Sequence, residues 1–138
     1  MNEDFELIFW TWYATDEHRP LVDACHGLKA LDFLESPSSV QCKTLNCCPA
    51  CDVEDLMSRV ERFLHNVRIG SPILEKRLME VLDQCNQLPE SALTYDDFLM
   101  FTDPAWESVR AAAAAALQLA GWSNLRNHVD EFLGQRVR

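Results

Sequence analysis

Six consecutive alanines, at positions 111–116, restrict the fold of this chain more than any other feature of the sequence. An apolar stripe over residues 106–120 runs through them, and its members recur every three or four positions, as on one face of a helix. Alanine is the best helix former, and its small side chain lets neighbouring helices approach closely. We therefore predict a tightly packed inner helix that starts at Asp103-Pro104 and ends at Gly121.

The rest of the chain shows the same periodicity. It predicts further helices over residues 3–14, 20–34, 52–70, 71–88, 94–101 and 123–134. No segment alternates apolar and polar residues as a half-buried strand does, and no linker or repeat divides the chain. We predict an all-α fold, a single compact domain (1–138) of six or seven helices. A cysteine-rich loop should separate the second and third helices, and the third and fourth should form an antiparallel hairpin.

The expected caps follow the usual preferences for helix ends. Asn2, Asp52 and Ser123 are predicted as N-caps, and Gly70 is predicted just past the end of the third helix. The first helix is apolar on nearly all of its faces, so we expect it to be central. Its two tryptophans, Trp10 and Trp12, are expected in the core, because large aromatic side chains at helical spacing are usually buried.

The charge of the chain limits the partners it can have. With 22 acidic and 12 basic residues, its formal net charge is −10. Such a chain repels phosphate backbones, so no direct nucleic-acid binding is expected, and it attracts a protein with a basic surface. The apolar runs are too interrupted to span a membrane, and the acidic N-terminus differs from a signal peptide. We expect a cytoplasmic protein without a membrane association, whose oligomeric state the sequence leaves open.

Four of the six cysteines fall within residues 42–51. In a reducing cytosol, thiols or thiolate–metal bonds are favoured over disulfides. A structural zinc needs four cysteine or histidine ligands, and a C-x-x-C pair supplies two of them from one turn. We therefore expect that a structural zinc, if bound, takes its ligands from Cys42, Cys48, Cys51, Cys47, Cys25 and His26, with the last three and Cys85 as alternatives for the fourth position. Cys85 lies on an apolar helix stripe and is expected in the core.

Two further interpretations of these cysteines stay open. Cys48 and Cys51 could form a redox pair, because the nearby start of a helix lowers the pKa of a thiol. No strand precedes this pair, however, and Asp52 and Glu54 oppose a thiolate. The cysteines could also be small buried or loop side chains without a special role.

Between Leu78 and Val109 the chain has no lysine, arginine or histidine, although acids and aromatic residues are frequent. Acidic side chains steer a basic partner, and desolvated aromatic side chains anchor it. We predict a partner-binding segment there, made of Glu90, Tyr95, Asp96, Asp97, Phe98, Phe101, Asp103 and Glu107. The alternative is a solvated acidic face over buried aromatic side chains.

The sequence has none of the catalytic motifs that we sought. The four histidines lack H-E-x-x-H spacing, and there is no glycine-rich phosphate loop and no G-x-S-x-G segment. We therefore expect a protein that is not an enzyme and acts by binding another macromolecule, as an inhibitor, immunity-type neutraliser, adaptor or regulator. The alternative is a thiol redox enzyme or sensor that uses Cys48 and Cys51.

Overall fold

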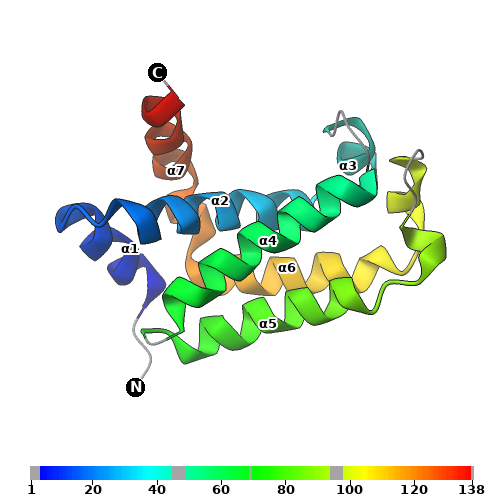
Figure 1. Cartoon of the computed structure of the whole chain (residues 1–138), viewed down its shortest axis with the longest axis horizontal. Helices are drawn as coiled ribbons and strands as arrows, with labels where there is room; N and C mark the ends of the chain where they lie inside the picture. Colours follow the sequence, from blue (N-terminus) through cyan, green and yellow to red (C-terminus); the bar gives the residue numbers. More distant parts are fainter. Residues whose placement is uncertain (1–3, 45–48, 69, 94–97, 138) are drawn as a thin grey trace.

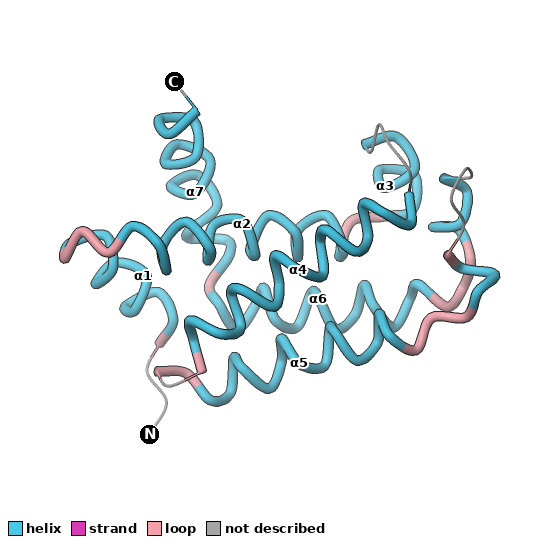
Figure 2. Tube along the Cα trace, viewed as in Figure 1, coloured by secondary structure: helices cyan, strands magenta, loops and turns pink. Residues whose placement is uncertain are grey.

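The structure, a computed structural model, describes residues 4–44, 49–68, 70–93 and 98–137. These residues form seven α-helices and two short 3₁₀-helices, with no strand among them (Figures 1 and 2). The all-α prediction is therefore confirmed. In chain order the elements are α1 (Phe5–Ala14), α2 (His18–Glu35), α3 (Ser38–Thr44), α4 (Pro49–Val67), α5 (Pro72–Asn86), η1 (Glu90–Ala92), η2 (Phe98–Thr102), α6 (Trp106–Ala120) and α7 (Trp122–Val137).

Four long helices surround the hydrophobic core. Helix α2 packs against α4 and α6, and α5 packs against the same two helices. In Figure 1, α1 and α7 lie near one end of this bundle, and α3 lies with the short helices at the other. Helices α4 and α5 run in opposite directions and pack together, so the predicted hairpin is confirmed.

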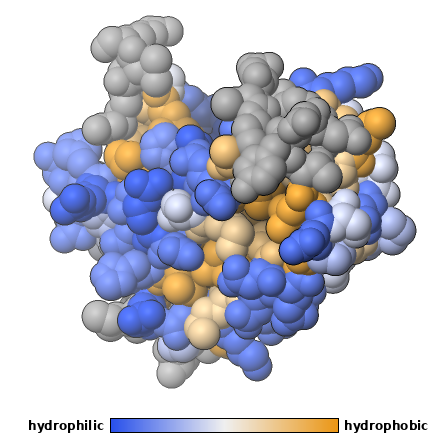
Figure 3. Space-filling model, turned by 45° about the vertical axis from the view of Figure 1, so that its right-hand side comes forward, coloured by the Kyte–Doolittle hydropathy of each residue, from blue (hydrophilic) through white to orange (hydrophobic). Residues whose placement is uncertain are grey.

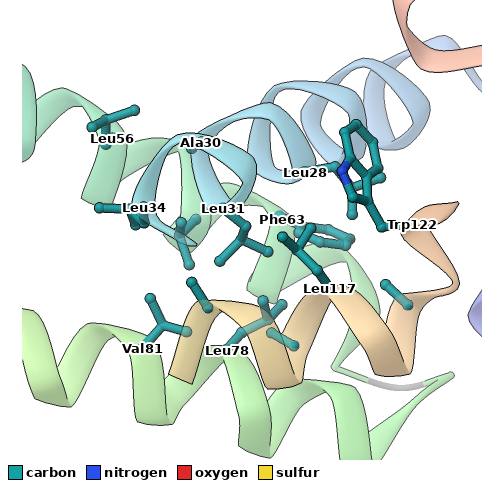
Figure 4. Packing of buried hydrophobic residues seen from close by; sticks show 14 of the residues in the cluster. Leu28, Ala30, Leu31, Leu34, Leu56, Phe63, Leu78, Val81, Leu117 and Trp122 are labelled. Atoms are coloured by element: carbon teal, nitrogen blue, oxygen red, sulfur yellow. The ribbon is translucent and has the colours of Figure 1, made fainter. Parts of the chain in front are cut away.

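The core is continuous and built from aliphatic and aromatic side chains of all four helices. Figure 4 shows Leu28 and Leu31 of α2 facing Phe63 of α4, Leu78 of α5 and Leu117 of α6. The alanine run contributes as predicted: Ala113 and Ala116, and Ala120 at the end of the same stripe, are fully buried, whereas Ala111 and Ala114 on the opposite face are exposed. Gly121, with φ of 78°, ends α6 in the left-handed conformation that glycine tolerates best.

Helices α2 and α4 touch through a glycine. Gly27 is buried, and a Cβ atom added to it would lie 2.5 Å from the Cβ atom of Phe63. The missing side chain is therefore what allows the two helices to come this close. At this crossing, Gly27 of α2 lies directly beside Phe63 of α4.

The prediction that the first helix is central is wrong. Phe5 and Phe9, one turn apart, bury the inner face of α1, while Leu7 and Tyr13 are 61% and 57% exposed. Trp10 is 37% exposed, so only Trp12, which is half-buried against the core, partly fulfils the expectation for the tryptophans. The helix lies at one end of the bundle, where neighbours cover only one side of it (Figure 1).

Several predicted helix ends are also wrong. Asp4, not Asn2, caps α1, because its Oδ1 accepts a hydrogen bond from the backbone N–H of Glu6 at 2.9 Å. Helix α4 begins at Pro49, so Asp52 lies inside its first turn. Helix α4 ends at Val67, so Gly70 is not the residue directly after it. Helix α7 begins at Trp122 and continues to Val137, which places both Ser123 and Gly134 inside it.

The segment predicted as a cysteine-rich loop contains a helix of its own. The Pro37 carbonyl oxygen accepts hydrogen bonds from the backbone N–H groups of Val40 and Gln41 at 2.9 and 3.1 Å, which starts α3. The Ser-Pro sequence that ends α2 thus also begins the next helix. In the part of the chain that the structure describes, no helix is long and apolar enough to cross a membrane.

Candidate functional site

The cysteine segment and the acidic segment, far apart in the sequence, meet at one end of the molecule. Helix α3 packs against η2, and both lie at the end of the bundle opposite to α1 (Figures 1 and 2). We call this region the α3–η2 end, and define it as α3, the first turn of α4, η1, η2 and residues 103–110. It contains most of the described residues that the sequence singled out.

Arg110 of α6 holds this end together. Its Nε donates to the Ser36 carbonyl oxygen and to the Gln41 Oε1, both at 3.2 Å, and its Nη2 donates to the same Gln41 oxygen at 2.8 Å. The Nη2 also donates to the Phe101 carbonyl oxygen. Because the side chain is only 11% exposed, these bonds connect the end of α2, α3, η2 and α6 inside the protein.

Gln41 is the partner of Arg110 in this cluster and is itself fully buried. Its Nε2 donates to the carbonyl oxygens of Phe33 and Leu34 at 3.0 and 3.1 Å, near the last turn of α2. Carbonyls at the end of a helix lack an intrahelical partner, so Gln41 satisfies groups that would otherwise be buried and unbonded. We refer to Arg110, Gln41 and their backbone acceptors as the Arg110–Gln41 cluster.

Sequence reasoning missed this cluster, although one signal for it exists. Arg110 is the only basic residue between Leu78 and Leu125. A single arginine beside an apolar helix stripe has five donors that need partners if the side chain is buried. Two of its partners, Ser36 and Gln41, however, come from positions about 70 residues earlier, and no periodicity of the sequence indicates that pairing.

The acids predicted to bind a partner fall into two groups. Glu90 is exposed at the start of η1, and Glu107 is 76% exposed while its Oε1 accepts from the Nη1 of Arg110 at 2.7 Å. Asp103 is half-buried and serves the fold, because its Oδ1 accepts from the Ala105 backbone N–H at 2.9 Å. Tyr95, Asp96 and Asp97 lie outside the described residues.

The prediction that Phe101 contacts a partner is wrong, because Phe101 is fully buried and cannot anchor a partner while the fold is intact. Its ring packs edge-on against Phe33 at 5.7 Å between centroids and lies 4.9 Å from Trp106. A 3₁₀-helix has three residues per turn, so Leu99, two positions before Phe101, lies on a different face of η2. The side chain of Phe98 is outside the described residues.

The exposed apolar residues at this end were not among the predicted contacts. Leu99 of η2 is 64% exposed, and Val40 of α3 is 46% exposed. Figure 3, which turns this side of the molecule forward, shows apolar surface between hydrophilic areas. Within the described residues of the α3–η2 end, the basic side chains are Lys43, which is exposed, and Arg110, which is internal. The accessible charge of the end is therefore mainly negative.

Two of the expected metal ligands are placed at this end. Cys42 is half-buried in α3, and Cys51 is exposed in the first turn of α4, whereas Cys47 and Cys48 lie outside the described residues. Among the residues that are described, no group of three or more histidine, cysteine, aspartate or glutamate side chains could hold a metal ion. A four-coordinate zinc ion at this end therefore needs both Cys47 and Cys48.

Cys25 and His26, also predicted as candidates for the fourth ligand, lie too far from this end. Gly27 lies beside Phe63, and the Asn66 Nδ2 donates to Asp23 at 3.1 Å, so residues 23–27 run along the end of α4. Cys51 precedes Phe63 by twelve residues, about 18 Å at 1.5 Å per residue. Cys25 is also fully buried, and burial raises the pKa of its thiol to about 12.

Cys85 of α5 lies in the hydrophobic core, as predicted, and burial likewise raises the pKa of its thiol to about 12.

The chain matches no protein-family model, and no curated protein and no solved structure is significantly similar to it.

Proposed function

We propose that this protein acts by binding another protein through its α3–η2 end, and that the partner presents a basic surface. One observation carries the proposal. Exposed acids, Glu90 and Glu107, share this end with the exposed apolar residues Val40 and Leu99. Arg110, the one arginine among the described residues of this end, is used inside the fold. The net charge of −10 favours the same kind of partner.

The two kinds of side chain have different roles in such an interface. Acidic groups at the rim attract a basic surface over roughly 10 Å at moderate salt, which accelerates the encounter. Apolar side chains that lose water on contact supply most of the binding energy. The Arg110–Gln41 cluster holds the helices that present these groups in a fixed arrangement. We propose that the protein works in a reducing cytoplasm as an inhibitor, adaptor or regulator. Such a role needs a binding surface and no catalytic group.

The proposal predicts that a basic partner depends on the acids of this end. The test variant is Glu90→Lys with Glu107→Gln, where glutamine still offers an acceptor to Arg110. The matched control, Glu17→Lys with Glu61→Gln, changes the charge equally at exposed acids outside the α3–η2 end. We expect the immobilised protein and the control to capture the same partner from a lysate of the source cells at low salt, and the test variant to lose it.

Two outcomes would contradict this proposal. One is equal capture by the test variant and the control, which would place the interface elsewhere. The other is a captured partner whose binding strengthens with added salt, because attraction between opposite charges weakens as salt screens it. Reversing Asp96 and Asp97 to lysine provides a second variant in the same acidic segment.

We further propose that a structural zinc fastens this end through Cys42, Cys47, Cys48 and Cys51. Cys42 in α3 and Cys51 in α4 support this, because a metal ion between them would join two consecutive helices across residues 45–48. Structural zinc sites bind tightly enough to contribute to folding. The ion would hold α3 in position next to η2 and leave the acids exposed.

The zinc proposal makes its own prediction. Protein purified without added metal should contain about one zinc per chain, and a chelator should lower its melting temperature and expose additional thiols to a titrating reagent. Cys42→Ser should likewise lose the zinc and lower the melting temperature, whereas Cys85→Ala, which removes a core thiol, should keep the zinc. A metal content below about 0.2 per chain would exclude the site. A reversible disulfide between Cys48 and Cys51 in the same protein would instead favour the redox alternative.

A further inference from the structure

Helices α1 and α7 lie near the end of the bundle opposite to the α3–η2 end (Figure 1). Side chains of these two helices line a small aromatic pocket. Phe9, Trp10 and Tyr13 of α1 and His128, Glu131 and Phe132 of α7 line it. Phe9 is buried and forms part of its floor, while Trp10, Tyr13, His128 and Glu131 are exposed at its rim. The pocket is built from the surface of α1 that the sequence assigned to the core.

The rings of this pocket stand nearly at right angles to one another. The ring of Trp10 lies 5.3 Å from that of Phe9, 5.7 Å from that of Tyr13 and 4.8 Å from that of His128, between centroids. The corresponding interplanar angles are 86°, 77° and 80°. Each pair is an edge-to-face contact, so the rings pack together into one aromatic wall of the pocket. A ring face carries negative charge density, so an aromatic wall attracts a cation.

The size and charge of the pocket limit the class of ligand that it can bind. Its volume is about 80 Å³, below the roughly 300 Å³ or more of pockets for drug-sized ligands, so it fits a single small group. Glu131 places a carboxylate in the lining, and the whole chain carries a formal charge of −10. An anion is therefore disfavoured, and a small cation with an apolar outer surface satisfies both the rings and the carboxylate.

We propose that this pocket binds an alkylammonium group, of the trimethylammonium type, against the aromatic side chains that line it and beside the Glu131 carboxylate. The methyl groups of such a cation contact the ring faces, and its charge is spread over them. Two sources present this chemistry, a free choline-like molecule and a trimethylated lysine side chain of a partner. The site is separate from the α3–η2 end and does not depend on the proposed function.

Titration with two cationic probes and one neutral probe tests the proposal. Choline and a short peptide with a trimethylated lysine represent the two sources, and 3,3-dimethylbutan-1-ol, which has the shape of choline without its charge, is the control. We expect a cation to shift the indole NMR signal of Trp10 in a saturable way. The neutral alcohol should bind at least about five-fold more weakly. The cation that binds with the higher affinity shows whether the natural ligand is a choline-like molecule or a trimethylated lysine.

Substitutions at the pocket complete the test. Glu131→Gln keeps the shape of an exposed side chain and should weaken cation binding about three- to ten-fold. Trp10→Leu should remove binding, while Leu119→Ala, at an exposed apolar position of α6 outside the pocket, should leave it unchanged. Equal binding of choline and the neutral alcohol would overturn the proposal. So would the absence of a saturable shift with either cation, or full binding by the Glu131→Gln variant.

Discussion

Replacing Arg110 by methionine should lower the free energy of unfolding by about 3–5 kcal/mol. Methionine fills similar space but has no donor, so the Ser36 and Phe101 carbonyl oxygens and the Gln41 Oε1 lose their hydrogen-bond partner. A buried acceptor left without a partner costs about 1–3 kcal/mol. Chemical denaturation, followed by helical circular dichroism, measures the change.

The control for this prediction is a second arginine that also bonds to another helix. Arg126 contacts Asp32 at 3.3 Å, but its side chain is 57% exposed, so Arg126→Met should cost at most about 1 kcal/mol. Combining Arg110→Met with Gln41→Met should cost clearly less than the sum of the two single changes, because both remove the same bonds. Additive effects, or an Arg110 variant as stable as the Arg126 variant, would show that the cluster does not hold the end together.

The second large effect is expected at Gly27. Alanine is the better helix former by about 1 kcal/mol, so helix propensity alone predicts a gain from Gly27→Ala. The added methyl group, however, would lie 2.5 Å from the Cβ atom of Phe63, which is attached to the backbone of α4 and cannot rotate away. Helices α2 and α4 would have to separate. We expect a net loss of about 2 kcal/mol, since overpacking typically costs about 1–3 kcal/mol or more.

Gly134 provides the matched control, because it lies inside α7 and an added Cβ atom would meet nothing within 4 Å. Gly134→Ala should therefore stabilise the protein by up to about 1 kcal/mol. The same substitution is thus expected to lower the stability at Gly27 and to raise it at Gly134, and thermal unfolding would detect both changes. Stabilisation by both changes would mean that α2 and α4 do not approach as closely as described.

The fold could be predicted from apolar periodicity because helix–helix packing needs little else. The stripes that became the inner faces of α2, α4, α5 and α6 were visible in the sequence, as was the role of Gly121. Helix ends were less predictable, because several residues near each end can serve as the cap. Ser36-Pro37 ends one helix and starts another, and the sequence signal for the two roles is the same.

Burial could not be predicted where a helix lies at the end of the bundle. The apolar residues of α1 fit a central helix, yet Leu7 and Tyr13 are exposed. Conversely, Phe101 lies in an acidic segment and is nevertheless fully buried against Phe33. Long-range pairs such as Arg110 with Gln41 depend on how α3 and α6 are arranged, which a single sequence does not indicate.

Part of the predicted partner-binding segment lies at the surface, and part of it serves the fold. The acidic segment does present Glu90 and Glu107 at the surface, whereas Asp103 and Phe101 serve the fold. The apolar residues that accompany the acids, Val40 and Leu99, come from two segments about 60 residues apart in the sequence. Only the packing of α3 against η2 brings them to one end.

The central claim is that the α3–η2 end binds a basic partner, and the affinity of the captured partner tests it most directly. The dissociation constant should be measured at about 0.1 M salt for the unmodified protein, for Glu90→Lys with Glu107→Gln, and for Glu17→Lys with Glu61→Gln. We predict that the first variant binds at least about ten-fold more weakly and that the second changes the constant by less than about two-fold. Equal weakening by the two variants would contradict the claim, because it would show that net charge alone, and not this end of the molecule, attracts the partner.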